Sequence, residues 1–146
     1  MNMFTKACEY GIKASVYIID NSLRNEKVSL KEVAKAIDSP EAYTSKILQQ
    51  LSRKGIIQSD KGPTGGFSID KTKIEQIKLS RIVSAIDGDS IYNECGLGFH
   101  HCNESKPCLI HHQYASIRND LKTMLENTLL VDLSEDIDKG LSFLKR

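Results

Sequence analysis

The stretch from Ser29 to Gly55, SLKEVAKAIDSPEAYTSKILQQLSRKG, decides the fold of this chain. Ser29 is followed three residues later by Glu32, a spacing typical of the capping box that starts many helices. We therefore expect a helix over residues 30–37. A second helix follows after a short break, and two helices joined by a tight turn predict a helix-turn-helix.

The second helix begins at the break Asp38-Ser39-Pro40. We expect Ser39 to cap it and Pro40 to lie in its first turn, since proline lacks the N–H that a helix start leaves unpaired. Gly55 then ends the helix after a basic last turn. The residues expected to face inward follow helical spacing: Tyr43, Ile47, Leu48 and Leu51.

A helix precedes this motif and a hairpin follows it. Residues 5–22 carry apolar side chains at helical spacing, which predicts an N-terminal helix. Short apolar runs at 56–59 and 67–69 predict two strands, with a glycine-rich turn at 60–66. Three helices followed by a hairpin form a winged helix-turn-helix. The predicted fold class is mainly α with a small β-hairpin.

The second half of the chain predicts a short helix at 79–87, a loop at about 88–112, a long amphipathic helix at about 113–131 and a last short helix at 137–144. The long helix either packs back on the N-terminal helix or forms a two-fold seam. We favour dimerisation, because dimers read palindromic sites more specifically. The predicted domains are a DNA-binding domain at 1–78 and a unit at 79–146 that contains the loop and the dimerisation helix.

The outward side chains of the second helix are candidates for DNA contact, since this helix enters the major groove. Gln can read adenine edges, whereas Lys reaches guanine or phosphate. The predicted contacts on this helix are Glu41, Thr44, Ser45, Lys46 and Gln49, with Arg53 and Lys54 placed for phosphates.

The wing is the second candidate DNA contact. Lys61 is placed for a phosphate, and Gly62, Thr64 and Gly65 lie in the turn that would approach the DNA. Glycines remove side chains, so the backbone can come close to the sugar–phosphate surface. The alternative is an ordinary surface hairpin.

Charge and composition narrow the class of protein. Residues 1–78 carry a net charge of +4 and residues 79–146 a net charge of −3, which suits a basic DNA-facing module joined to another unit. The sequence shows neither a signal peptide nor a membrane span, so we expect a cytoplasmic protein. No nucleotide-binding loop or triad-like set appears, and we expect neither an enzyme nor a small-molecule substrate.

Three of the four cysteines fall in the predicted loop: Cys95, Cys102 and Cys108, with spacings C-x6-C and C-x5-C. Disulfides are disfavoured in the cytoplasm, so clustered thiols indicate metal or redox chemistry. Zinc ligands usually come in shorter C-x2–4-C pairs, whereas longer gaps suit a bulkier cluster. The spacing alone therefore places an iron–sulfur cluster only slightly ahead of zinc.

Several segments resemble the winged-helix regulators of the IscR and NsrR type, the Rrf-type iron–sulfur transcription regulators. These are FTKACEYG at 4–11, YTSKILQQL at 43–51 followed by KGII at 54–57, and KGPTGGF at 61–67. Lys61 stands where Arg is common, and Thr64 where Gly is common. The first cysteine gap is six residues, whereas five is frequent in these sensors, which leaves the path of the loop open.

The resemblance implies a homodimer formed through the long helix and an iron–sulfur cluster bound by the three loop cysteines, with 2Fe–2S favoured over 4Fe–4S. The fourth ligand varies among such regulators. Glu9 matches an acidic residue supplied by the partner subunit and is the expected fourth ligand. The alternative is His111, which matches a histidine three residues after the last cysteine. Carboxylate and imidazole both ligate iron.

The other candidate ligands have simpler interpretations. Cys8 is expected to be a small buried helix residue. His100, His101 and His112 are expected to lie on the loop surface.

These features predict a homodimeric transcription regulator that binds a palindromic operator in double-stranded DNA, and we expect it to act as a repressor. We expect it to sense redox state, nitric oxide or iron–sulfur status, with the order of the 88–112 loop and the spacing of the two recognition helices depending on the cluster. The alternatives are a regulator of the same fold that responds to thiol oxidation or zinc without a cluster, and a protein-interaction adaptor that does not bind DNA.

Overall fold

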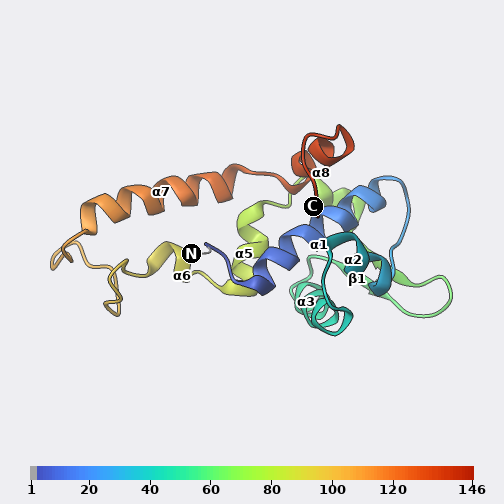
Figure 1. Cartoon of the computed structure of the whole chain (residues 1–146), viewed down its shortest axis with the longest axis horizontal. Helices are drawn as coiled ribbons and strands as arrows, with labels where there is room; N and C mark the ends of the chain where they lie inside the picture. The colour runs from blue at the N-terminus through green and yellow to red at the C-terminus, as the bar shows by residue number, and fades with distance from the viewer. Residues whose placement is uncertain (1–2) are drawn as a thin grey trace.

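The structure is a computed structural model that describes residues 3–146 (Figure 1). In chain order its elements are α1 (Lys6–Leu23), α2 (Leu30–Ile37), α3 (Glu41–Arg53), β1 (Gln58–Asp60), β2 (Gly66–Ser68), α4 (Lys71–Ile74), α5 (Leu79–Asp87), α6 (Ser90–Asn93), α7 (His111–Asn127) and α8 (Leu130–Asp138). The predicted class, mainly α with a small hairpin, is confirmed.

Helix α1 is the centre of the core, and α2, α3, α5 and α8 all pack against it. Its Ile18 and Ile19 have no exposed surface. Burying such a side chain stabilises the fold by roughly 1.5–3 kcal/mol. Because α5 and α8 belong to the second half of the chain, the core extends across the predicted domain boundary at residue 78.

The helix-turn-helix forms as the sequence predicts, with one difference at its turn. The capping box is present, since the Ser29 hydroxyl accepts from the Glu32 N–H and the Glu32 carboxylate accepts from the Ser29 N–H. The expected cap of α3 by Ser39 is wrong. Pro40 takes the N-cap position, and the Ser39 hydroxyl instead bonds to the hydroxyl of Thr44.

The wing is an antiparallel pair in which Ser59 lies opposite Phe67. Its first strand begins later than expected, because Ile56 and Ile57 are buried in the core ahead of it. A further bridge joins Phe67 to Val28, with N–H to carbonyl distances of 3.0 and 2.7 Å. The wing is therefore held by the segment between α1 and α2 as well as by its own turn.

The C-terminal end differs most from the sequence prediction. The helix expected at 137–144 is wrong, and the chain forms α8 over Leu130–Asp138 instead. Leu130 and Ser134 are fully buried, and α8 packs along α1. The short helices α4 and α6 were also not predicted.

Helix α7 and the loop before it project from the rest of the molecule as an arm (Figure 1). Only part of the apolar face of α7 is covered by the rest of the chain. Leu125 is buried, and Leu121 packs against the core. Ile117 and Met124 are 67% and 45% exposed. The covered residues of this face attach α7 to the core, and the exposed residues remain in contact with solvent.

Candidate functional site

The recognition helix α3 presents most of its predicted contacts to solvent. Glu41, Lys46, Gln49 and Arg53 are exposed, and Ser45 is half-buried. Thr44, which was expected to point outward, is fully buried. Its hydroxyl donates to the Pro40 carbonyl at 2.8 Å, so Thr44 holds the first turn of α3 together instead of facing a groove.

Tyr43 also differs from its predicted inward position. It is 36% exposed, and its ring stands edge-on to Tyr10 at a centroid distance of 5.6 Å. The two rings lie where α1 meets α3. Ile47, Leu48 and Leu51 are buried as predicted.

Two hollows flank α3. One, of about 390 Å³, lies between α1 and α3, and the other, of about 260 Å³, lies between α3 and the wing. Gln49 and Arg53 line both. Gln50 lines the hollow between α1 and α3, and Ser59 lines the hollow between α3 and the wing; neither was among the predicted contacts.

The predicted phosphate contacts keep free positive charge. None of Lys46, Arg53, Lys54 and Lys61 takes part in the ion pairs found within residues 3–146. At the wing tip Lys61, Gly62 and Thr64 are exposed, and Gly65 is half-buried against the Asp60 carbonyl, which leaves no room for a side chain. An exposed basic helix beside an open turn suits a phosphate backbone.

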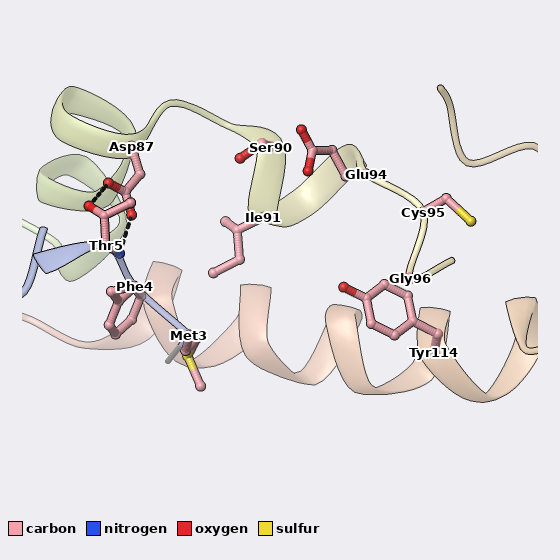
Figure 2. Close-up of a pocket in the computed structure, with 10 residues that line it drawn as sticks. All are labelled: Met3, Phe4, Thr5, Asp87, Ser90, Ile91, Glu94, Cys95, Gly96 and Tyr114. Carbon is pink, nitrogen blue, oxygen red and sulfur yellow. Dashed lines mark hydrogen bonds between the residues drawn. The ribbon is translucent and has the colours of Figure 1, made fainter. Parts of the chain in front are cut away.

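The cysteine loop begins where Gly96 packs on α7. A methyl group at Gly96 would lie 2.8 Å from the ring of Tyr114, so only glycine allows this approach. Figure 2 shows the Tyr114 ring beside Gly96 and the Cys95 thiol pointing away from the neighbouring cavity. That cavity, of about 400 Å³, lies between the N-terminal segment, α6 and α7. The contact fixes Cys95 relative to the long helix.

Cys95 and Cys108 lie close enough to influence each other. The N–H groups of Leu97 and Phe99 point at the Cys95 sulfur and lower the pKa of this thiol, with a smaller contribution from Cys108. The Leu97 nitrogen is 3.4 Å from the sulfur. Partial burial and the neighbouring Cys95 raise the pKa of Cys108.

Cys102 pairs with a histidine. Its Sγ atom lies 3.2 Å from Nδ1 of His111, the first residue of α7. His111 is 6% exposed, whereas His100 and His101 are exposed on the loop as expected. His112 is exposed too, but it lies in the first turn of α7 and not in the loop. Within residues 3–146 no three His, Cys, Asp or Glu side chains gather as a site for one metal ion, so convergence of the three thiols stays a prediction.

The remaining candidates lie on α1. Glu9 is half-buried and forms an ion pair with Lys6 at 3.3 Å. Cys8 is fully buried, as predicted, and burial together with the adjacent Asp87 carboxylate raises its pKa to about 12. Cys8 is therefore a neutral core thiol.

Helix α5 connects the arm to the recognition helix. Its last residue, Asp87, accepts a hydrogen bond from the Thr5 N–H at 3.1 Å, where Thr5 caps α1 (Figure 2). Its neighbour Ile86 packs against Gly11 of α1, and Gly11 faces Ile47 of α3. Any side chain at Gly11 would collide with Ile86.

The family model for Rrf2, described as an iron-dependent transcriptional regulator, matches residues 4–136. The chain belongs to the Rrf2 family. A protein assigned as an HTH-type transcriptional regulator in Aquifex aeolicus is 29% identical over 141 residues, 95% of this chain and 96% of its own. An rrf2-like regulator assigned in Rhodobacter capsulatus is 24% identical over 142 residues, 90% of this chain and 91% of its own.

Solved structures show the same fold. CymR, described as the global cysteine regulator of B. subtilis, matches with a TM-score of 0.75 and 20% identity over 92% of this chain and 98% of its own. IscR of T. potens matches with a TM-score of 0.72 and 19% identity, over 94% of this chain and 90% of its own. The oxidised form of Staphylococcus aureus CymR matches with a TM-score of 0.69 and 22% identity, over 92% of this chain and 97% of its own.

Rrf2 members are transcription regulators, so this chain belongs to a DNA-binding and non-enzymatic family. None of the helices in its described residues is long and apolar enough to cross a membrane. For this Rrf2 protein the sequence missed the burial of Thr44, although a threonine four residues after Pro40 can donate its hydroxyl to the Pro40 carbonyl, which also accepts the Thr44 N–H.

Proposed function

We propose that this Rrf2 protein is a homodimeric regulator that binds a palindromic operator and senses redox state, nitric oxide or iron–sulfur status through a cluster. The ligands are Cys95, Cys102 and Cys108 of one chain with a fourth ligand, for which we favour His111 over Glu9 of the partner subunit. The observation that carries the proposal is the 3.2 Å approach of Cys102 to His111.

The donor set fits a cluster better than a single ion. Cys102 lies beside His111, Cys95 and Cys108 influence each other, and Cys102 also acts on Cys108. In a 2Fe–2S cluster each iron takes two protein ligands, and histidine can replace cysteine as a ligand. Zinc ligands usually come in shorter C-x2–4-C pairs, so we favour 2Fe–2S over zinc.

When bound, the cluster supplies a centre that accepts electrons and reacts with oxygen or nitric oxide. The chain's own residues connect this centre to DNA. Ligation fixes the loop between α6 and α7, and α5 links the start of that loop to α1 through Asp87 and Thr5. Ile86 and Gly11 then reach Ile47 on the recognition helix. A change in loop order thus acts on the helix that reads DNA.

The exposed apolar residues of α7 support the dimer. Ile117 and Met124 are seven positions apart on one helix face, and both side chains are exposed in the single chain. A second copy packed antiparallel along α7 would bury both faces and set the distance between two recognition helices.

Binding of apo and holo protein to the same operator DNA, measured without oxygen over a range of salt, tests this function. We expect the two forms to differ in affinity, and both to bind more weakly as salt rises, because phosphate contacts release counterions. Equal affinity in both forms would refute cluster sensing. Binding to no DNA at all would favour the adaptor.

A second candidate is a thiol-oxidation regulator without a cluster. The proximity of Cys95 to Cys108 and the lowered pKa of Cys95 favour it, and one solved relative is an oxidised form of CymR. A peroxide would oxidise one thiolate to a sulfenic acid, and the other thiol would displace water to form a disulfide. Cluster-free protein whose DNA affinity changes on peroxide treatment would support this candidate.

A further inference from the structure

The wing carries one carboxylate, and it lies next to the basic tip. Asp60 is the only acidic residue between Gln58 and Ser68, and it immediately precedes Lys61, a predicted phosphate contact. Two like charges repel each other at short range even in water. A bare carboxylate at this position would therefore oppose the approach of the wing to a phosphate.

The chain places a lysine on this carboxylate. The Nζ atom of Lys27 lies 2.9 Å from Oδ2 of Asp60, and the two side chains are 44% and 51% exposed. Lys27 does not belong to the wing. It lies in the segment between α1 and α2, which runs beside the wing (Figure 1). The negative charge of the wing is thus neutralised by a cation from another part of the fold.

The backbone holds Lys27 where its side chain can reach β1. The next residue, Val28, forms the bridge to Phe67. Gly66 lies opposite Asp60 in the hairpin, and a Cβ atom on Gly66 would be 3.2 Å from Cβ of Lys27. Because glycine has no side chain, Lys27 can extend across β2 to Asp60. The position of the ion pair follows from the strand pairing.

The ion pair lies on the side of the wing that faces away from the recognition helix. Ser59 lines the hollow between α3 and the wing. Successive side chains of a strand point to opposite faces, so Asp60 points away from that hollow and toward Lys27. Lys27 is therefore placed to act on Asp60, and not on a phosphate held between α3 and the wing.

We propose that Lys27 is a positioning residue for DNA binding, which cancels the charge of Asp60 and so lets Lys61 and the wing turn approach a phosphate. This inference rests on the proposed placement of the wing against DNA. It gives Lys27 no contact with DNA of its own. Without Lys27, the Asp60 carboxylate repels the phosphate and competes with it for the ammonium group of Lys61.

The test is the affinity of protein isolated without oxygen for a mixed-sequence DNA duplex at low salt, measured by fluorescence anisotropy. Phosphate contacts do not depend on base sequence, so this probe does not require the operator. We expect Lys27→Gln to weaken binding about two- to fivefold, the size of effect that exposed charges have. Lys27→Arg keeps the charge and should bind like the parent chain. Adding Asp60→Asn to Lys27→Gln should restore the parental affinity.

Glu26 provides the matched control for net charge. It is an exposed carboxylate next to Lys27 but outside the wing, and it takes part in none of the ion pairs within residues 3–146. Adding Glu26→Gln to Lys27→Gln restores the same net charge as adding Asp60→Asn, yet it should leave binding weak. If it restores the affinity equally well, net charge explains the effect and the inference is wrong.

The other outcomes separate this inference from the proposed function. The inference is wrong if Lys27→Gln binds like the parent chain, or if adding Asp60→Asn leaves it weak, because Lys27 would then contact DNA itself or hold the wing in place. It is also wrong if Asp60→Asn alone weakens binding, as expected of a pair that only braces the wing. None of these results changes the proposed function. A parent chain without salt-dependent DNA binding refutes both.

Discussion

The sulfur of Cys102 lies 3.2 Å from Nδ1 of His111, although nine positions separate them in the chain. The contact joins the cysteine loop to the first residue of α7, the helix that carries the exposed apolar face. One proposed ligand pair thereby includes a residue of the element proposed to form the dimer seam. In the proposed function, sensing and dimer geometry meet at His111.

His111→Ala should weaken cluster retention, because the pair with Cys102 loses its imidazole donor. The measurement is the decay of visible absorption after anaerobic protein is exposed to air, and we expect decay at least several-fold faster than in the parent chain. His112→Ala, on the exposed neighbouring ring, is the control and should change little. If Glu9→Gln accelerates the decay and His111→Ala does not, the fourth ligand comes from the partner subunit.

Thr44 and Gln49 should respond in opposite ways to substitution. Thr44→Val removes a buried hydroxyl that bonds to the Pro40 carbonyl and to the Ser39 hydroxyl, while the Thr44 N–H still donates to that carbonyl, so the free energy of unfolding should fall by about 1 kcal/mol. Gln49→Ala touches only an exposed side chain, and should leave thermal stability unchanged while weakening operator binding by about 1–3 kcal/mol. Calorimetry and a DNA titration on both variants check this. A Gln49→Ala chain that binds its operator normally would contradict the placement of α3 in the groove.

Ile117→Asp should convert the dimer into single chains, because a carboxylate would be buried unpaired in an apolar seam. Light scattering measures the mass. Asn119→Asp adds the same charge two residues along α7, on a different face, and should leave the dimer intact. A dimeric Ile117→Asp chain would place the interface elsewhere.

Asp138→Asn should stabilise the fold at neutral pH. A hydrogen bond with Asp20 raises the pKa of Asp138, as do partial burial and the charge of Asp20, whereas Arg24 opposes them. The folded pKa exceeds the unfolded one, so the stabilising contribution is full below the ordinary value of 3.8 and is lost as pH rises through the raised value. Asp138 also ends α8, where negative charge opposes the helix dipole.

The measurement for this carboxylate is the melting temperature as a function of pH. The parent chain should lose stability relative to Asp138→Asn as pH rises above the ordinary aspartate range. Asp132→Asn, in the first turn of α8, is the control and should be neutral or slightly destabilising. Parallel curves for the parent chain and Asp138→Asn would show that the two carboxylates do not interact.

The sequence predicted the parts of the fold that local chemistry determines. Ser29 and Glu32 form their capping box, and Gly55 ends its helix with a positive φ of 74°. Tertiary contacts decided the rest. The last helix was expected at 137–144, but the structure has it at Leu130–Asp138, where Leu130 and Ser134 are buried and the helix packs on α1.

The sequence identified which residues belong to the candidate site, but it did not predict how they are arranged in space. Cysteine spacing singled out the loop, yet it could not show that Cys102 lies beside His111, because that contact depends on where α7 begins. The cytoplasmic location and the palindromic operator stay predictions.

The most direct test of the central claim is iron and acid-labile sulfide analysis of protein isolated without oxygen from iron-replete cells. We predict a coloured protein with iron and sulfide in equal amounts, and loss of both when Cys102 is replaced by Ser. Colourless protein free of iron and sulfide, from a chain that is folded and binds DNA, would contradict the account.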